Sequence, residues 1–186
     1  LADPYWLNKV RDGNLDDIRP CIACHNGCFS ISAYKGNPCG YYRMASCAVN
    51  PAAMNEANQV IAPADQKKNV AVVGGGIGGM EAAMIAAQRG HKVTLYEQSG
   101  ELGGVFIAAA APDFKEKDKQ LIQWYIKQVS DMDIDIRLNT PASPELLKGA
   151  DEVILAVGAS PRCLPTDGLA AAMASGRAME AIEYLR

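Results

Sequence analysis

Apolar and polar positions follow two regular patterns in the second half of the chain. Short apolar runs that end at glycine or polar residues predict buried strands at 69–73, 92–97, 134–138 and 152–157. Between the first two runs, an Ala-rich stretch over 77–89 predicts a buried helix that stops at Gly90. An apolar stripe over 115–132 predicts an amphipathic helix. Alternating strands and helices predict an α/β fold with a Rossmann-like, doubly wound parallel sheet of the FAD/NAD(P)-binding type.

The first 68 residues lack this periodicity. Residues 1–20 are polar with Pro and Gly breaks, which is typical of a connector. Residues 21–68 hold a cysteine-rich, loop-forming segment followed by a linker with about one helical turn. We therefore divide the chain into a connector at 1–20, a cysteine segment and linker at 21–68, and a dinucleotide-binding domain at 69–186.

Composition narrows the classes of partner. The 186 residues carry a net charge of −3 and are 49% apolar, which is ordinary for a globular domain. Nucleic acids and anionic membranes are not expected partners, because phosphate binding needs clustered Lys and Arg. The longest apolar runs, such as 105–111, are too short to span a bilayer. The oligomeric state, a homo-oligomer included, stays open.

A glycine-rich turn follows the first predicted strand. Gly74, Gly76 and Gly79 form G-x-G-x-x-G between a strand and a helix, which is the context that this motif requires. Gly74 permits a tight turn, Gly76 allows a pyrophosphate to approach the backbone, and Gly79 lets the helix pack closely on the strand. The helix N-terminus would then face the phosphates.

Further residues favour a flavin nucleotide at this turn. Glu97 ends the second predicted strand, where a carboxylate can accept hydrogen bonds from a ribose diol. The later pair Gly103 and Gly104 resembles FAD-binding flavoproteins with two dinucleotide domains more than simple NAD dehydrogenases. The strand ending in Val157-Gly158 resembles the "ATG" strand of those flavoproteins, with Val157 replacing the usual Thr. The simpler alternative is that these glycines only make turns. FAD is the expected ligand, and ADP stays open.

Cysteines crowd into the segment before the domain. Cys21, Cys24 and Cys28 form C-x2-C-x3-C, and Cys39 or Cys47 would supply a fourth thiolate. Four thiolates suit a [4Fe–4S] cluster. Zinc sites more often use two separated C-x2-C pairs, and disulfide frameworks belong to small secreted scaffolds without a nucleotide-binding core. We therefore expect an iron–sulfur cluster in a reducing, cytoplasmic compartment.

The two histidines and the remaining cysteine offer little catalytic chemistry. His25 sits among the cluster cysteines, where it fits a loop residue or a hydrogen-bond donor to a cluster sulfur. His91 follows Gly90 in a tight turn, as a surface residue would. Cys163 is isolated and is expected to fill apolar space. No catalytic acid or base is assigned.

These motifs together resemble one enzyme family. The runs 18–24 (IRPCIAC) and 47–51 (CAVNP), with Cys28 and Glu56, are similar to the iron–sulfur NADH:flavin oxidoreductases. That family includes 2,4-dienoyl-CoA reductase, enoate reductases and trimethylamine dehydrogenase. Residues 1–13 resemble the segment that closes its FMN-binding barrel. The cysteine spacing departs from the family, since eighteen residues (29–46) separate Cys28 from Cys47, but the C-x-V-N-P context favours Cys47 over Cys39.

The resemblance implies a larger enzyme. The chain starts at Leu1 without Met, so we expect a preceding FMN barrel, a following NAD(P)H-binding domain and an incomplete FAD domain here. The implied function is NAD(P)H-dependent reduction of a small unsaturated molecule of the enoate or dienoyl type. Electrons would pass from FAD through the cluster to FMN. The alternatives are an amine dehydrogenase relative with structural ADP, and a stand-alone electron carrier.

Overall fold

A computed structural model describes residues 1–28, 45–163 and 165–185. Its centre is one parallel sheet in the order β3-β2-β1-β4. The strands are β1 (Asn69–Val73), β2 (Lys92–Tyr96), β3 (Ile134–Arg137) and β4 (Glu152–Leu155). In the register of the sheet, Val72 lies opposite Leu95 on one side and Ile154 on the other. The Rossmann-like, doubly wound parallel fold predicted from the sequence is therefore confirmed.

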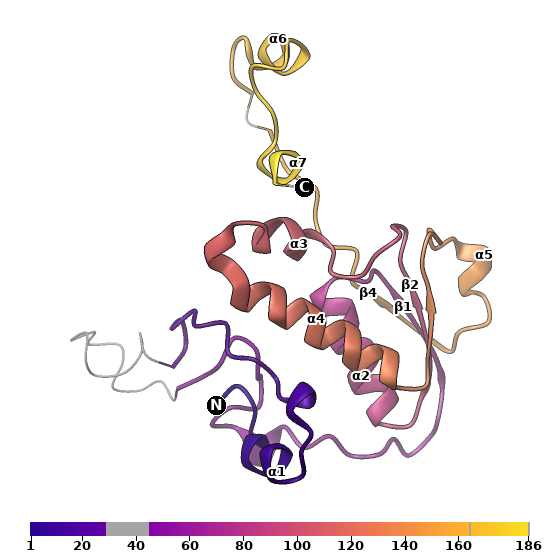
Figure 1. The fold of residues 1–186 in the computed structure, drawn as a ribbon. Coiled ribbons are helices and arrows are strands. Elements are labelled where there is room, and N and C mark those ends of the chain that lie inside the picture. Colours follow the sequence, from indigo (N-terminus) through magenta and orange to yellow (C-terminus); the bar gives the residue numbers. More distant parts are fainter. Residues whose placement is uncertain (29–44, 164, 186) are drawn as a thin grey trace.

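Two helices cover one face of the sheet (Figure 1). They are α2 (Ile77–Gln88) and α4 (Glu116–Asp131). Their inward side chains and the two central strands form the core: Val70, Val72, Met80, Ala83, Met84, Val93, Leu95, Leu121, Trp124, Tyr125 and Val129. Helix α2 packs closely because its core positions are small or unbranched residues, as the Ala-rich sequence predicts.

Shorter elements complete the domain. Helix α3 (Val105–Ala110) and a 3₁₀ turn η5 (Asp113–Lys115) lead into α4. Helix α5 (Pro144–Leu147) is capped at its N-terminus by Ser143, whose Oγ accepts a hydrogen bond from the N–H of Leu146. Leu146 shares a surface hollow with strand residues Ala71 and Thr94, so α5 lies on the sheet face opposite α2 and α4.

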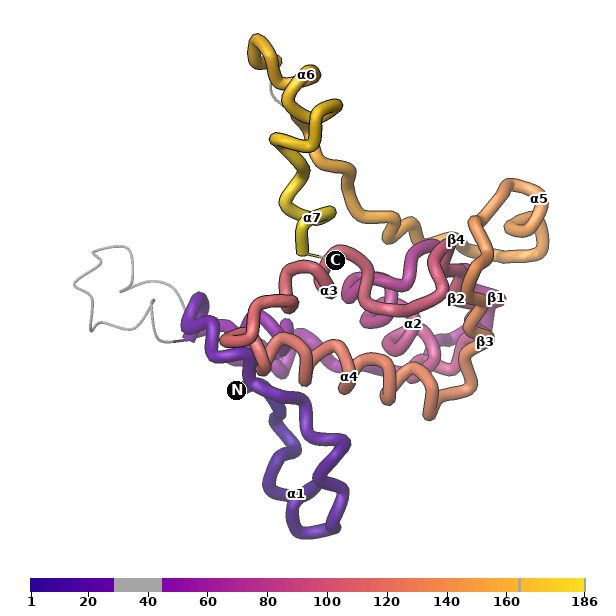
Figure 2. Tube along the Cα trace, turned by 45° about the horizontal axis from the view of Figure 1, so that its top comes forward, coloured from indigo at the N-terminus to yellow at the C-terminus, as the bar shows by residue number. Residues whose placement is uncertain are grey.

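The N-terminal segments hold α1 (Trp6–Arg11) and the 3₁₀ turns η1 (Leu15–Asp17) and η4 (Glu56–Asn58). Of these, η1 contacts α4, while α1 points away from it, and the C-terminal segment projects from the sheet (Figure 2). The projecting segment holds α6 (Leu169–Ala174) and α7 (Ala181–Tyr184). No helix in the described ranges combines the length and apolar character needed to cross a membrane.

The expected burial of β4 and Cys163 is wrong. All four residues of β4 are exposed, and Leu155 is 72% exposed. β4 pairs with β1 on one side only and is the edge strand of the described sheet, so no further strand covers its outer edge. Cys163 is also exposed, and its Sγ lies 3.6 Å from Oε1 of Glu180.

Candidate dinucleotide site and cysteine segment

The predicted glycine-rich turn lies at the carboxyl end of β1 and leads directly into α2. Gly74 has φ +108°, a conformation that side chains rarely adopt, and a Cβ there would lie 2.3 Å from the carbonyl oxygen of Ala156. A Cβ on Gly79 would lie 1.8 Å from the carbonyl oxygen of Gly74. Packing within the protein is therefore enough to explain why the first and third positions of the motif are glycine.

Gly76 differs from the other two motif glycines. A Cβ there would meet no atom within 4 Å, and its φ of −70° and ψ of 178° are open to any residue. Gly76 is also the N-cap of α2, and no side chain caps that helix. The exposed N-terminus of a twelve-residue helix attracts anions through its N–H groups and dipole. The space beside Gly76 is therefore suited to a phosphate group.

Glu97 is fixed against the glycine turn. It is 7% exposed, and its Oε2 accepts a hydrogen bond of 2.6 Å from the N–H of Gly75. Its Oε1 accepts from the N–H and the Oγ of Ser99 at 2.8 and 2.7 Å. Burial acts to raise the pKa of this carboxyl, but hydrogen bonds from Ser99, Gly75 and Gln98 outweigh it and hold the pKa below its usual value. Glu97 is thus a preoriented carboxylate at neutral pH.

The second glycine pair lies directly on the first turn. The N–H of Gly103 donates to the carbonyl oxygen of Gly75 at 2.8 Å, and Gly103 forms a parallel bridge with Gly76. Gly103 and Gly104 have φ of +125° and +58°. A Cβ on Gly104 would lie 3.1 Å from Cα of Gly76, which explains why glycine suits this position.

The last predicted site glycine lies further along the neighbouring strand. The N–H of Ala156 donates to the carbonyl oxygen of Val73 at 2.8 Å, so the end of β4 borders the turn. Gly158 follows with φ +71° and open space around its Cα. The structure therefore gathers Gly74, Gly76, Glu97 and the 103–104 pair, with Gly158 at the margin.

The cysteine segment is organised differently. Cys21 and Cys24 are exposed, while Cys28 and Cys47 are half-buried, and all four are free thiols. Within residues 1–28, 45–163 and 165–185, no three His, Cys, Asp or Glu side chains gather as metal ligands. The competing fourth ligand, Cys39, lies outside the described residues. The assignment of Cys21, Cys24, Cys28 and Cys47 to a cluster stays a prediction.

The backbone nevertheless brings the third and fourth cysteines into neighbouring segments. The N–H of Ser46 donates to the carbonyl oxygen of Gly27 at 3.0 Å, next to Cys47 and Cys28. Gly27 is buried, and a Cβ there would lie 2.3 Å from Oγ of Ser46. In the first loop, the N–H of Ala23 points at Sγ of Cys21 at 3.4 Å. The thiol of each of these cysteines is a soft donor of the kind that iron–sulfur clusters use, and one N–H, that of Ala23, is directed at a sulfur.

Comparison with known proteins identifies the family. Residues 68–186 match the sequence profile described as pyridine nucleotide-disulphide oxidoreductase. The chain therefore belongs to this family of oxidoreductases. Its relatives are reductases and amine dehydrogenases of the 2,4-dienoyl-CoA reductase and trimethylamine dehydrogenase type, which confirms the resemblance seen in the sequence.

Three relatives show the range of this branch. The chain is 45% identical over 170 residues to cinnamate reductase of Clostridium sporogenes, covering 90% of this chain and 24% of the relative. It is 29% identical over 172 residues to dimethylamine dehydrogenase of Hyphomicrobium sp., covering 86% and 22%. The structure of a 2-naphthoyl-CoA reductase complex superposes with a TM-score of 0.83 at 32% identity, covering 96% and 28%. The chain thus spans about a quarter of these relatives.

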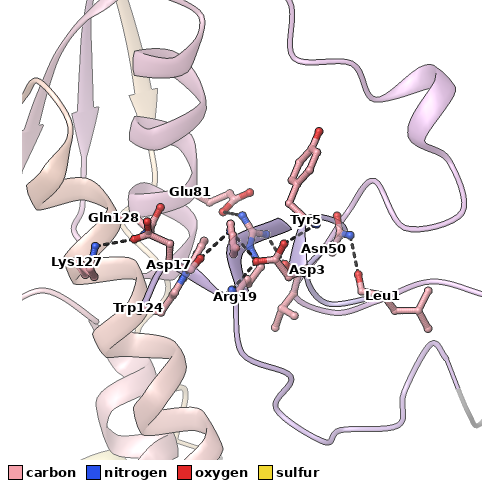
Figure 3. A network of polar contacts seen from close by, with 12 residues as sticks. Leu1, Asp3, Tyr5, Asp17, Arg19, Asn50, Glu81, Trp124, Lys127 and Gln128 are labelled. Atoms are coloured by element: carbon pink, nitrogen blue, oxygen red, sulfur yellow. Dashed lines mark hydrogen bonds and ion pairs between the residues drawn. The ribbon is translucent and has the colours of Figure 1, made fainter. Parts of the chain in front are cut away.

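One polar network escaped sequence reasoning. Asp17 accepts hydrogen bonds at Oδ1 from Lys127 and Gln128, at 2.7 and 3.3 Å, and its carbonyl oxygen accepts one from Trp124 Nε1 at 2.9 Å (Figure 3). This network fastens the predicted connector to α4. Trp124 lies one residue before Tyr125, which belongs to the predicted apolar stripe. This position was the one sequence feature that could have indicated that Trp124 contacts another segment.

Proposed function

We propose that this chain is the electron-relay part of an NAD(P)H-dependent iron–sulfur flavin oxidoreductase that reduces an unsaturated, enoate- or dienoyl-type substrate. Electrons would enter from NAD(P)H, pass through FAD and a [4Fe–4S] cluster, and leave to FMN in the rest of the full-length protein. The single observation that carries this proposal is the 45% identity to cinnamate reductase across both the cysteine segment and the dinucleotide domain.

The glycine turn supports FAD as the bound nucleotide. Gly76 leaves room for a pyrophosphate at the N-terminus of α2, and Glu97 presents a carboxylate for a ribose diol. A flavin, when bound, supplies hydride and single-electron chemistry that no amino-acid side chain offers. The residues of this chain bind and orient the nucleotide, and none of them is proposed as a catalytic acid or base.

The cysteine segment supports a cluster next to this site. Cys21, Cys24, Cys28 and Cys47 are the proposed ligands, and of the same segment Ile22 and Cys47 pack against the hydrophobic core. The substrate and FMN would bind in the preceding barrel, and the nicotinamide in a following domain. These further domains of the protein itself are the proposed partners of the chain, at work in the cytoplasm.

A second function is favoured by the amine-dehydrogenase relatives. In that case Gly76 and Glu97 would hold ADP as a structural ligand, because both residues face only the adenosine and pyrophosphate end of a nucleotide. The 29% identity to dimethylamine dehydrogenase carries this alternative. The geometry of the glycine turn is the same for either ligand.

Two measurements on the full-length protein test these functions. Mass spectrometry of the acid-released ligands is expected to find FMN with FAD, whereas FMN with ADP would favour the amine dehydrogenase. Anaerobic NADH oxidation with cinnamate as acceptor is expected to turn over in the full-length protein and not in residues 1–186 alone. Turnover by residues 1–186 would overturn the relay, because the active site would then lie within this chain.

A further inference from the structure

Arg19 connects the parts of the chain that carry the two proposed cofactor sites. Its backbone N–H donates to Oδ2 of Asp3 at 2.8 Å, and Cys21 follows two residues later. Its Nη1 donates to the carbonyl oxygen of Val49, which lies two residues after Cys47. One residue therefore borders both the first and the fourth proposed ligands.

The same guanidinium reaches the dinucleotide domain. Its Nη2 lies 3.4 Å from Oε2 of Glu81 on α2 (Figure 3). Its carbon Cζ lies 4.6 Å from the ring centroid of Trp124 and 5.9 Å from that of Tyr125, both on α4. The Arg19 side chain is 15% exposed, so these cation–π contacts are largely shielded from water. Arg19 thus links the cysteine segment to both helices that cover the sheet.

The surrounding contacts hold Arg19 in place. Nζ of Lys9 bridges Oδ2 of Asp3 and the carbonyl oxygen of Asp17, at 2.7 Å each. The amide of Asn50, which is buried, donates to the carbonyl oxygen of Leu1 at 2.7 Å. The backbone on both sides of Arg19 and the loop after Cys47 are therefore anchored independently of any cluster.

The arrangement requires arginine rather than lysine. A guanidinium is planar and carries donors in a fixed fork, so it can stack on Trp124 while bonding Val49 and Glu81 in different directions. A lysine ammonium would keep the charge near Glu81 but lose the stacked plane.

From this geometry we propose that Arg19 is a positioning residue for the cluster, an inference that rests on the proposed function. It holds the Cys21 and Cys47 loops at a fixed separation from each other and against α2 and α4. Arg19 thereby contributes to the placement of the cluster relative to the dinucleotide domain without being a ligand itself. Removing it would loosen two ligands at once.

The test compares variants of the full-length protein after anaerobic cluster reconstitution. In Arg19→Gln, bleaching of the cluster's visible absorbance by an iron chelator is expected to be about tenfold faster, the scale of outer-shell effects on metal sites. The paramagnetic resonance line shape of the reduced cluster is also expected to change. The bleaching rate of Arg19→Lys should fall between those of the wild type and Arg19→Gln, because lysine keeps the positive charge but lacks the planar guanidinium.

Two controls separate positioning from general stability. Arg11→Gln alters an exposed arginine whose one ion pair among the described residues is with its neighbour Asp12, and it should bleach like the wild type. Val93→Ala removes a buried core methyl pair on β2, remote in sequence from the cysteines, and supplies a variant with a lowered unfolding midpoint. Arg19→Gln should bleach faster than Val93→Ala at equal distance from each variant's unfolding midpoint.

The outcomes are distinct. Wild-type bleaching rate and line shape in Arg19→Gln would overturn the positioning role and leave the relay intact. Equal bleaching of Arg19→Gln and Val93→Ala would likewise overturn it, in favour of a purely structural role. If Arg19→Gln does not fold, Arg19→Lys decides by the same two readouts. A wild-type protein that binds no iron and sulfide would overturn the proposed function and this inference with it.

Discussion

The glycine turn and the cysteine segment differ in how tightly they are packed. On the turn, a Cβ on Gly79 would lie 1.8 Å from a backbone oxygen, whereas Cys21 and Cys24 in the cysteine segment are exposed. The glycine turn is built from backbone that packs tightly within the protein itself. The proposed cluster site would depend on side chains whose gathering is coupled to metal binding, because thiolates repel one another until a cation joins them. The two neighbouring regions are therefore expected to respond very differently to the loss of their cofactors.

The largest effect is expected from removal of a proposed cluster ligand. Cys47→Ser should abolish the visible absorbance of the cluster and expose the ligand-bearing residues 21–28 to proteolysis, while residues 69–157 stay resistant. Cys39→Ser is the matched control and should retain the cluster. The reverse behaviour of the two variants would show that Cys39 is the fourth ligand. Cleavage within 69–157 in the cluster-free protein would contradict the independence of the two regions.

The next largest effect is expected on the stability of the dinucleotide-binding domain, at Gly79. Gly79→Ala is expected to lower the free energy of unfolding by about 4 kcal/mol, because its Cβ would collide with backbone that cannot rotate away. Gly78→Ala, next to it on α2, meets no atom within 4 Å and should be neutral or stabilising by up to about 1 kcal/mol. Denaturant unfolding of the two variants measures the difference. Equal stability would show that the close helix packing is absent in solution.

A substitution at Gly76 is expected to weaken nucleotide binding without lowering the stability of the fold. Gly76→Val should leave the unfolding midpoint within the range of a surface change, since the position is open in space and in backbone conformation. It should weaken FAD or ADP binding by about 3 kcal/mol, because the branched side chain would occupy the phosphate position. Calorimetric titration with each nucleotide checks this. Unchanged affinity would place the phosphates elsewhere.

Glu97 is expected to have a smaller effect on binding. Glu97→Ala should weaken adenine-nucleotide affinity by roughly 1–3 kcal/mol, the range for a hydrogen bond to a charged group. Ser99→Ala removes one of the donors that orient the carboxylate and should cost less. An affinity for ADP or FAD that is unaltered in Glu97→Ala would remove the ribose role.

The smallest predicted effect is the pH dependence that Glu97 confers on stability. Its folded-state pKa lies below the ordinary 4.5, so its contribution is fully present above about pH 4.5 and is lost as pH falls through the folded-state pKa. The difference in unfolding free energy between wild type and Glu97→Gln should therefore shrink as pH falls from 5 to about 3. A difference that grows on acidification would mean that the carboxyl pKa is raised.

Sequence reasoning predicted the nucleotide region well for a physical reason. The strand β1 was placed at 69–73 and α2 at 77–89, within one residue of the structure, because buried periodicity and glycine punctuation are local signals. The contact of Gly103 with Gly75, by contrast, was not predicted, because it joins two separate turns.

The failures have a physical reason too. The apolar sequence of β4 predicted burial, but an edge strand is paired on one side only, and within the described chain no further strand follows β4 in the sheet. The contact between Arg19 and Trp124 joins residues far apart in sequence, and no periodic pattern marks such a pair. Helices α1 and α3 are six residues each, too short for a helical period to stand out.

In the proposed relay, electrons pass from the flavin at the glycine turn to the cysteine-ligated cluster. The most direct test is anaerobic addition of NADH to the reconstituted full-length protein, followed by rapid freezing and electron paramagnetic resonance. In the wild-type protein, we expect the signal of a reduced iron–sulfur cluster to develop after the flavin absorbance begins to fall. In Cys47→Ser, we expect this signal to be absent. Full flavin reduction in the wild-type protein without any cluster signal would contradict the relay.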